Sequence, residues 1–283
     1  MPLSASQPSN SPAKTFDAPF IRENATPETW QALGRLSQLP NPQIDLKSLP
    51  KRGVAAVLVL LHLVPETSAL TVTLTTRSQR LRSHPGDTAL PGGRVDSTDD
   101  NVISAAVSNL EANEEIGLPI EDVTQYGYLG TLDPFLSRTL LIVYPVVYIY
   151  LHSPKKLLEN LKANEDEVSA IFHLPLENIL QAYSIKSPPG TLDGLVHSKR
   201  DLKWIHGTPY RWHSFSSPSL PSPLTGLTAD ILISLVILAY NVVTPGFGPV
   251  KAPAQPDWET LIQWALTGEG GGEHDEHSIV HKS

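Results

Sequence analysis

Residues 92–118 read GGRVDSTDDNVISAAVSNLEANEEIGL, a glycine turn followed by a predicted helix. The last turns of that helix carry Glu111, Glu114 and Glu115. Positions i, i+3 and i+4 lie on one face of a helix, so the three carboxylates share a stripe. Like charges this close repel one another unless a cation lies among them. The stripe therefore predicts an Mg²⁺ or Mn²⁺ site, and a solvated acidic helix face is the alternative.

Two adjoining motifs surround this stripe. Glu111 to Leu118, EANEEIGL, is similar to the part of the Nudix box that runs Glu-x-x-Glu-Glu-x-Gly-apolar. Leu74 to Asp99, LTTRSQRLRSHPGDTALPGGRVDSTD, resembles the extended signature of the coenzyme A (CoA) pyrophosphatase branch of that family. This signature contains an arginine-rich stretch after a strand, then His-x-Gly, and then Pro-Gly-Gly-basic-x-Asp. By this resemblance the chain is identified as a Nudix hydrolase of the CoA diphosphatase branch.

The resemblance implies an α/β fold, the Nudix-like αβα sandwich with a mixed β-sheet, over approximately Lys51 to Val243. It also implies metal-dependent hydrolysis of the diphosphate of CoA or a CoA derivative. The products are then 4′-phosphopantetheine, or its acyl form, and adenosine 3′,5′-bisphosphate. Two alternatives stay open. One is hydrolysis of oxidised nucleoside triphosphates or other nucleoside diphosphate derivatives, and the other is a catalytically weak or inactive protein that binds CoA or a nucleotide.

The box departs from the family pattern at Leu110, which stands where the family has an Arg. Gly93 precedes Glu111 by 18 positions (111 − 93), about two more than the family pattern has. Two extra helical residues rotate everything upstream by about 200°, so we expect the helix to bulge or its N-terminal part to unwind. Replacing residues 108–110 by one Arg would restore both the register and the missing cation.

Diphosphate hydrolysis at neutral pH needs charge neutralisation, because the phosphate oxygens are anionic. A divalent cation held by carboxylates supplies it and lowers the pKa of a bound water. We expect Glu114 and Glu115 to be metal ligands, Glu111 to be a further ligand, and all three to be catalytic. The general base is one of these glutamates or an acid from another loop. Five further acids are candidates for metal binding or catalysis: Asp96, Asp99, Glu165, Asp166 and Glu167. The alternative for each is a structural role as a loop, turn or helix-cap residue.

A basic loop follows the second predicted strand and leads into the glycine turn. Arginine forks bind phosphate in bidentate fashion, so the loop predicts a ligand that carries several phosphates. By the resemblance this ligand is CoA, which has a 3′-phosphate besides its diphosphate, and a solvated basic loop is the alternative. The predicted substrate-binding residues of the loop and the turn are Arg77, Arg80, Arg82, His84, Gly92, Gly93 and Arg94.

The chain has 283 residues, a net charge of −8 and a pI near 5.7. This acidity argues against a nucleic-acid polymer as the partner, so we expect a small-molecule substrate. The sequence contains no cysteine, which excludes a disulfide framework, a cysteine nucleophile and a thiolate zinc site. Catalysis then relies on oxygen and nitrogen groups. Oligomeric state is left open.

Apolar runs and turn signals predict an α/β order of elements. Predicted strands span residues 55–63, 69–76, 126–132, 139–151 and 168–174. Besides the box helix, predicted helices span 27–39, capped by Thr26, 176–183 and 229–242. Residues 186–223 form a long excursion rich in proline and glycine. Its aromatic residues pack together or cover an adenine or pantetheine, and they are Trp204, Tyr210, Trp212 and Phe215.

Three parts are expected: a tail, short helix and linker in 1–50, the Nudix domain in 51–243, and an extension in 244–283 that is disordered from about 268. The apolar runs 53–64 and 231–240 are shorter than the ~20 residues that span a bilayer, so we expect no membrane association. The N-terminus lacks the pattern of a secretory signal. A peroxisomal or cytoplasmic location is expected, although the last three residues match the peroxisomal Ser-Lys-Leu address only at its lysine.

Overall fold

The computed structural model describes residues 16–42, 53–95, 111–118, 123–183, 194–242 and 249–267. Helices in these ranges are α1 (Pro19–Asn24), α2 (Pro27–Leu36), α4 (Glu111–Ile116), α5 (Pro154–Asn160), α6 (Leu176–Tyr183), α7 (Gly226–Tyr240) and α8 (Trp258–Thr267). Strands are β1 (Val54–Val64), β2 (Ala69–Arg77), β3 (Thr88–Ala89), β4 (Gly92–Arg94), β5 (Tyr126–Thr131), β6 (Phe135–Leu136), β7 (Ile142–Tyr150), β8 (Val168–Pro175), β9 (Val196–Lys203), β10 (Pro209–Ser216) and β11 (Leu224–Thr225). The five predicted strands are confirmed, within about three residues at their ends.

The main sheet has the order β3-β2-β1-β7-β5, with β4 beside β1, β6 beside β7 and β8 beside β2. The central strands β1 and β7 run parallel, whereas the other pairs are antiparallel. Both central strands are almost continuously aliphatic or aromatic, as strands buried on two faces require. The sheet is therefore mixed, as predicted.

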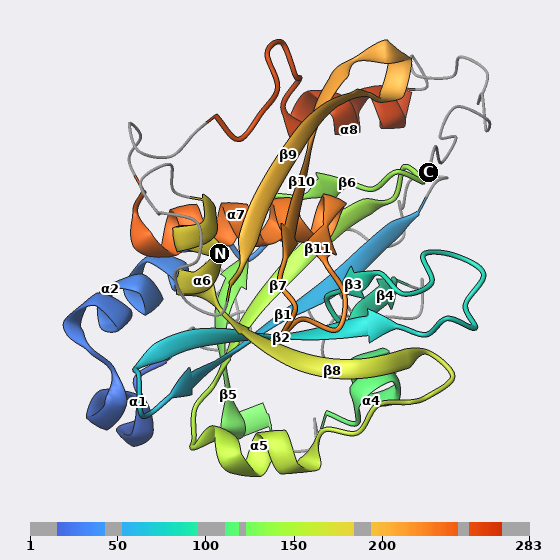
Figure 1. The fold of residues 1–283 in the computed structure, drawn as a ribbon. Coiled ribbons are helices and arrows are strands. Elements are labelled where there is room, and N and C mark those ends of the chain that lie inside the picture. The colour runs from blue at the N-terminus through green and yellow to red at the C-terminus, as the bar shows by residue number, and fades with distance from the viewer. Residues whose placement is uncertain are drawn as a thin grey trace, which may run out of the picture.

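Helices cover both faces of this sheet (Figure 1). Val59 and Leu61 of β1 belong to the core that α2, α6 and α7 complete. Leu58 and Leu60 point the other way, because successive strand residues alternate, and they pack with Ile116 of α4 and with α5. The predicted αβα sandwich is confirmed, and α4 lies on the face that carries the even-numbered side chains of β1.

Helix α2 begins as predicted and ends earlier. Thr29 N–H donates to Thr26 Oγ1 at 3.2 Å, and Pro27 occupies the first helical position. The helix stops at Leu36 instead of Leu39. Helix α1, which no pattern predicted, precedes it. The linker prediction for 40–50 lies mostly outside the described residues.

Within the predicted excursion at 186–223, residues 196–216 form a β-hairpin, which no sequence pattern indicates. Strands β9 and β10 pair in register from Val196 opposite Ser216 to Lys203 opposite Pro209. Strand β9, VHSKRDLK, is charged and largely exposed, so it lacks the apolar alternation that marks a strand. Among the aromatic residues of the predicted excursion, Trp204 and Tyr210 pack together as expected, with their ring centroids 5.2 Å apart.

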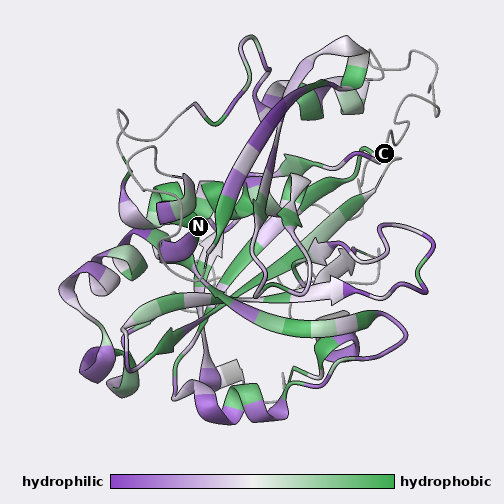
Figure 2. Cartoon of the chain, in the orientation of Figure 1, coloured by the Kyte–Doolittle hydropathy of each residue, from purple (hydrophilic) through white to green (hydrophobic). Residues whose placement is uncertain are grey.

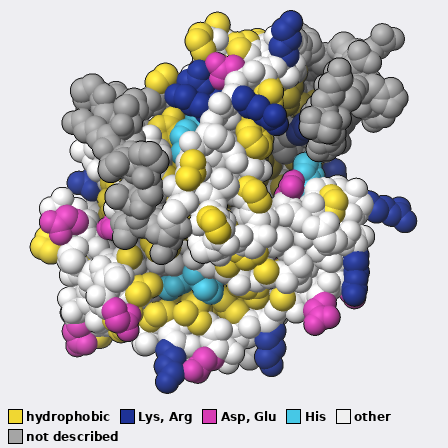
Figure 3. Space-filling model, viewed as in Figure 1, with side chains coloured by type: hydrophobic (Ala, Val, Ile, Leu, Met, Phe, Trp, Pro, Cys, Tyr) yellow, Lys and Arg dark blue, Asp and Glu magenta, His cyan; other side chains and the backbone are white. Residues whose placement is uncertain are grey.

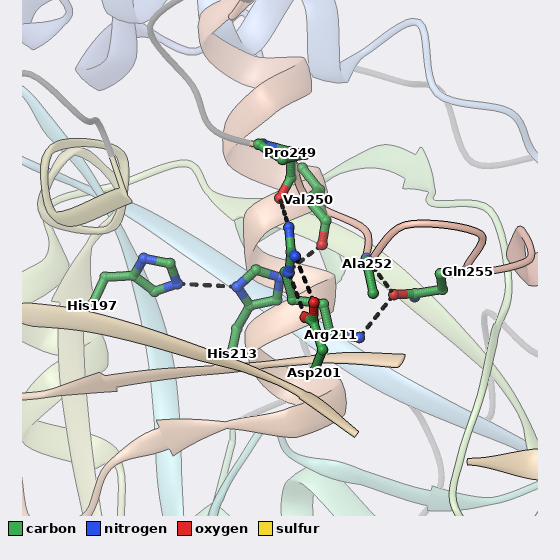
Figure 4. A network of polar contacts seen from close by, with 8 residues as sticks. All are labelled: His197, Asp201, Arg211, His213, Pro249, Val250, Ala252 and Gln255. Atoms are coloured by element: carbon green, nitrogen blue, oxygen red, sulfur yellow. Dashed lines mark hydrogen bonds and ion pairs between the residues drawn. The ribbon is translucent and has the colours of Figure 1, made fainter. Parts of the chain in front are cut away.

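Residues 249–255 are fastened to this hairpin by a polar network (Figure 4). Arg211 donates two hydrogen bonds to the carboxylate of Asp201, at 2.7 and 2.8 Å, and a third to Pro249 O at 2.9 Å. His213 Nε2 lies 2.9 Å from Val250 O. We call these contacts the Arg211 clamp; they hold the chain that leads into α8.

The C-terminal helices differ from the prediction in extent. Helix α7 starts at Gly226, three residues before the predicted Ala229, and ends at Tyr240. Helix α8 lies in the expected extension, residues 244–283, where the sequence patterns predict no helix or strand. It buries Leu261 and Ile262. Residues 268–283, predicted to be disordered, lie outside the described chain. None of the described helices has the length and apolarity to cross a lipid bilayer.

Polarity follows the layers. In Figure 2 the central strands and α7 are largely hydrophobic, whereas β9 is largely hydrophilic. Figure 3 shows Lys and Arg side chains projecting from the right-hand edge, where Figure 1 places the loop between β2 and β3. The predicted basic loop is thus a rim beside β4.

Candidate active site

Helix α4 ends at a glycine and is anchored by two buried apolar residues. Gly117 has φ +63°, and its N–H donates to Asn113 O at 2.8 Å. Ile116 and Leu118 are buried against leucines of β1. The box helix therefore ends at Gly117. Because Ile116 is buried in the core, it fixes the position of the preceding residue, Glu115, relative to the sheet.

Glu115 lies inside the protein, with 6% of its surface exposed. Its Oε2 accepts a hydrogen bond from Gly92 N–H at 3.3 Å, which ties α4 to the glycine turn. Gly92 has φ +144°, and a Cβ there would lie 2.3 Å from Ala56 O. Only glycine lets β4 approach β1 this closely, so the turn is placed to offer its N–H to the carboxylate.

The other two box glutamates differ from Glu115. Glu114 is exposed, because successive helical residues point about 100° apart. The side chain of Glu111 lies outside the described residues, as do Asp96 and Asp99. In the ranges that the structure describes, no three His, Asp or Glu side chains are arranged to hold a metal ion. The three-carboxylate stripe therefore stays a prediction.

The turn that precedes β8 joins α4 to the basic loop. Asn164 N–H donates to Glu115 O at 2.9 Å. From the other side, Ser78 N–H donates to Glu167 O at 2.8 Å. Helix α4, the acidic turn and the start of the basic loop therefore lie together, although the sequence separates them widely. Neither Asn164 nor Ser78 was predicted to matter, since both act through backbone groups that leave no motif.

The three acids of this turn are not equivalent. Glu165 and Asp166 are exposed, and Glu167 is half-buried. Asp166 pairs with Arg80 at 2.9 Å, but these side chains are 83% and 70% exposed, so the pair stabilises the fold little. Glu165 and Asp166 fit the reading of solvated loop charges. Glu167, bonded through its carbonyl to the basic loop, stays a candidate for the additional acid.

Arg77 is the inner member of the basic loop. Its N–H donates to Asp87 O at 2.9 Å and its carbonyl accepts from Gly86 N–H at 3.0 Å, which closes the loop. The Nε atom of Arg77 is buried and has no hydrogen-bond partner among the described residues. A buried donor without a partner costs free energy, typically about 1–3 kcal/mol. An anionic ligand would offset this cost.

The outer members of the predicted substrate site face solvent. Arg80, Arg82 and His84 are exposed, and His84 Nδ1 lies 2.9 Å from Asp87 Oδ2. Arg94 is exposed as well, at the end of β4. The structure thus joins Glu115 to the glycine turn inside the protein, buries the Nε atom of Arg77 at the start of the basic loop, and leaves the other predicted basic groups exposed.

The model of the NUDIX domain family matches residues 52–191 of this chain. An uncharacterised Nudix hydrolase named NudL, from Salmonella dublin, is 43% identical over 144 residues, which are 51% of this chain and 68% of the relative. NudL from Escherichia coli is 43% identical over 143 residues, 50% of this chain and 67% of the relative. The chain belongs to the Nudix hydrolase family.

The solved structures that resemble this chain are more distant in sequence. The NUDIX domain of Shewanella oneidensis NrtR in complex with ADP-ribose is 22% identical, with a TM-score of 0.34, and the match covers 49% of this chain and 82% of that one. A Caenorhabditis elegans Ap4A hydrolase is 19% identical, with a TM-score of 0.32, over 44% of this chain and 80% of that one. The family assignment rests on the sequence matches.

Nudix hydrolases generally use divalent metal ions such as Mg²⁺ or Mn²⁺, and the donors present here fit such an ion. Glu115 and Glu114 offer carboxylate oxygens, the ligands that these hard cations prefer. A buried carboxylate is costly unless hydrogen bonds or cations offset its charge, and the Gly92 N–H is one such donor. A divalent cation, when bound, neutralises the diphosphate and acidifies the attacking water.

Proposed function

We propose that this protein hydrolyses the diphosphate bond of CoA or a CoA derivative with the help of Mg²⁺ or Mn²⁺. The observation that carries the proposal is the contact of Glu115 with the Gly92 turn, together with the turn before β8, which bonds both to Glu115 and to Ser78, the residue after Arg77. A buried carboxylate and the start of the basic loop are thus tied to the same turn, and the Arg77 Nε atom there has no hydrogen-bond partner among the described residues. A multiply phosphorylated substrate fits both.

Each group has a role in this proposal. Glu115 and Glu114, with Glu111, hold the metal ion, and one of them or Glu167 takes the proton of the attacking water. Arg77 binds the diphosphate from the inner end of the basic loop, where its guanidinium is partly removed from water and its hydrogen bonds are correspondingly stronger. Arg80, Arg82, His84 and Arg94, on the rim, receive the 3′-phosphate of CoA.

Turnover of pure CoA tests the proposal. The full chain is expected to release adenosine 3′,5′-bisphosphate with Mg²⁺ or Mn²⁺ and to stop when EDTA is added. Glu115→Gln is expected to lower kcat about a hundredfold or more, because an anionic group at the reaction centre is lost while its volume is kept. Glu159→Gln, an exposed acid of α5, is the matched control. Full turnover by Glu115→Gln at saturating Mg²⁺ would remove this site from consideration.

The role of the rim arginines in binding the 3′-phosphate is tested by comparing CoA with dephospho-CoA, which lacks that group. CoA is expected to be preferred over dephospho-CoA by about tenfold or more, since a charged hydrogen bond contributes roughly 1.5–3 kcal/mol. Arg80→Ala or Arg82→Ala is expected to shrink that preference, and Arg138→Ala, exposed outside the loop, to leave it intact. Equal hydrolysis of the two compounds by the unchanged protein contradicts the role of the rim.

A catalytically inactive protein that binds CoA or a nucleotide is the second candidate. The observation in its favour is Leu110 in place of the box Arg, together with the two extra residues upstream. Tight CoA binding without metal-dependent cleavage would establish this function. Cleavage of CoA at a rate typical of enzymes would exclude it.

A further inference from the structure

Gly93, Ala56 and Tyr144 form one row across three neighbouring strands of the main sheet. Gly93 on β4 is paired with Ala56 on β1, and Ala56 is paired on its other side with Tyr144 on β7. Strands in a sheet lie about 4.8 Å apart, so the Cα atom of Tyr144 is roughly 10 Å from that of Gly93. Gly93 has no side chain and Ala56 only a methyl group, so Tyr144 is the largest residue of the row.

The row lies on the face that carries the candidate active site. Paired residues of neighbouring strands point to the same face, so Tyr144 shares the face of Ala56 and Leu58. Leu58 packs against Ile116 of α4, the residue next to Glu115. Tyr144 also packs against the cluster that contains Val95, directly after β4. Tyr144 therefore lies across β1 from the glycine turn, on the side opposite to the basic loop.

Within the described residues, Tyr128 and Tyr150 have hydroxyl partners, whereas Tyr148 has only a ring contact and Tyr144 has neither. Tyr128 O–H lies 3.0 Å from Thr131 Oγ1, and Tyr150 O–H donates to Gln125 Oε1 at 3.1 Å. The ring of Tyr148 packs on that of Tyr128, with centroids 5.3 Å apart. Within the described ranges, Tyr144 has neither a hydrogen bond nor a ring contact of this kind. Partly buried tyrosines usually find a partner for the hydroxyl, so this one has an unused donor.

The chemistry of this donor is defined by its surroundings. Burial raises the pKa of the Tyr144 hydroxyl above its ordinary value, which keeps the phenol neutral and able to donate. Side chains of a strand stand roughly perpendicular to the sheet, so the hydroxyl rises on the face that α4 and Glu115 occupy. Anionic phosphate oxygens are the strongest acceptors that a diphosphate substrate offers there.

We propose that Tyr144 is a specificity-determining residue that donates a hydrogen bond to a phosphate oxygen of the bound diphosphate. Arg77 and Tyr144 then hold the phosphates from opposite sides of the glycine turn. The inference rests on the proposed function in so far as it takes the substrate to lie over Gly92 and Gly93. It does not depend on which diphosphate compound is cleaved, nor on whether the box is catalytically competent.

Binding of α,β-methylene-ADP with Mg²⁺ tests this, because the analogue carries the diphosphate but is not hydrolysed. Calorimetric titration of Tyr144→Phe is expected to show about tenfold weaker binding than the unchanged protein, with the same thermal unfolding midpoint, since only a hydroxyl is lost. Tyr148→Phe removes the same group from the same face, four residues along β7, and is expected to bind as the unchanged protein does. Equal affinity of Tyr144→Phe, an equal loss in Tyr148→Phe, or no measurable binding to the unchanged protein overturns the proposal.

CoA turnover provides a separate readout. If the analogue binds and responds to Tyr144→Phe while CoA is not cleaved, the proposed function fails and the role of Tyr144 stands. If CoA is cleaved, Tyr144→Phe is expected to raise KM more than it lowers kcat, because the hydrogen bond is made to the bound substrate as well as to the transition state. Cleavage of CoA with an unchanged KM in Tyr144→Phe overturns the role of Tyr144 alone.

Discussion

At the scale of single residues, the contact between Gly92 and Glu115 depends on a position that tolerates no side chain. A Cβ at Gly92 would lie 2.3 Å from Ala56 O and 2.6 Å from Val57 Cα, both backbone atoms that cannot move aside. Gly92→Ala is therefore expected to destabilise the protein by about 2 kcal/mol or more and to push β4 away from β1.

A second glycine supplies the control for this prediction. Gly34 lies inside α2, and nothing approaches within 4 Å of the Cβ position. Gly34→Ala is expected to stabilise the protein by about 0.5–1 kcal/mol, because glycine is a poor helix former. Urea unfolding of both variants measures the two effects. Similar unfolding free energies for the two variants would mean that the close approach at Gly92 is absent.

At the scale of elements, two ion pairs of arginine differ in what they hold together. Arg211 is buried, binds Asp201 through two atoms and also binds Pro249 O, so it joins the hairpin to the segment before α8. Arg211→Ala is expected to cost about 1–2 kcal/mol, because the three hydrogen bonds of the buried guanidinium are lost while its exposed partners Asp201 and Pro249 are hydrated by water. Arg80→Ala, which breaks an exposed pair, is expected to cost less than about 0.5 kcal/mol. Chemical unfolding measures both, and equal losses would show that the Arg211 clamp does not fasten α8.

The box helix is the second element that can be tested. The structure describes only Glu111–Ile116 of it, so the expected bulge or unwinding upstream stays a prediction. Replacing residues 108–110 by one Arg is expected to raise both metal-dependent CoA cleavage and the unfolding temperature. The change restores the register and the cation, and a misplacement of about 1 Å can cost roughly a hundredfold in rate. A repaired protein without either gain would show that the insertion is accommodated.

At the scale of the whole molecule, a buried acid couples stability to pH. Asp230 of α7 accepts a hydrogen bond from Tyr210 O–H at 2.6 Å, and burial raises its pKa to about 8. Between its unfolded pKa near 4 and about 8 the folded protein binds more protons than the unfolded chain, so stability falls as pH rises. Burial lowers the pKa of His62 and of His197 to about 4, which gives the opposite slope below pH ~6.5.

The acid's own contribution is therefore measured at pH 6.5–8 as the difference between the unchanged protein and Asp230→Asn, because the histidines, which lose their last protons in the unfolded chain over this window, act equally in both. This difference in the free energy of unfolding is expected to fall by up to about 2 kcal/mol as pH rises from 6.5 to 8. Urea unfolding at pH 6.5, 7.2 and 8.0 provides the comparison. An equally steep slope in Asp230→Asn would assign the pH dependence to another group.

The sequence by itself determined the family, the central strands and the end of the box helix. Runs such as that of β1 are apolar enough to identify a buried strand, and Gly117 marks a helix end through its own conformational freedom. These are local properties, and local spacing records them. The Nudix resemblance added the αβα arrangement that the pattern alone only permitted.

Only the tertiary structure decided which groups meet. Glu114 and Glu115 are neighbours in the motif, yet one faces solvent and the other the glycine turn, because Ile116 is drawn into the core. The polar strand β9 is a strand only because β10 pairs with it. Asn164, Ser78 and Tyr144 gain their positions from strand register and backbone hydrogen bonds between distant segments. Such long-range pairing depends on the backbone and on burial, for which single residue types carry little signal.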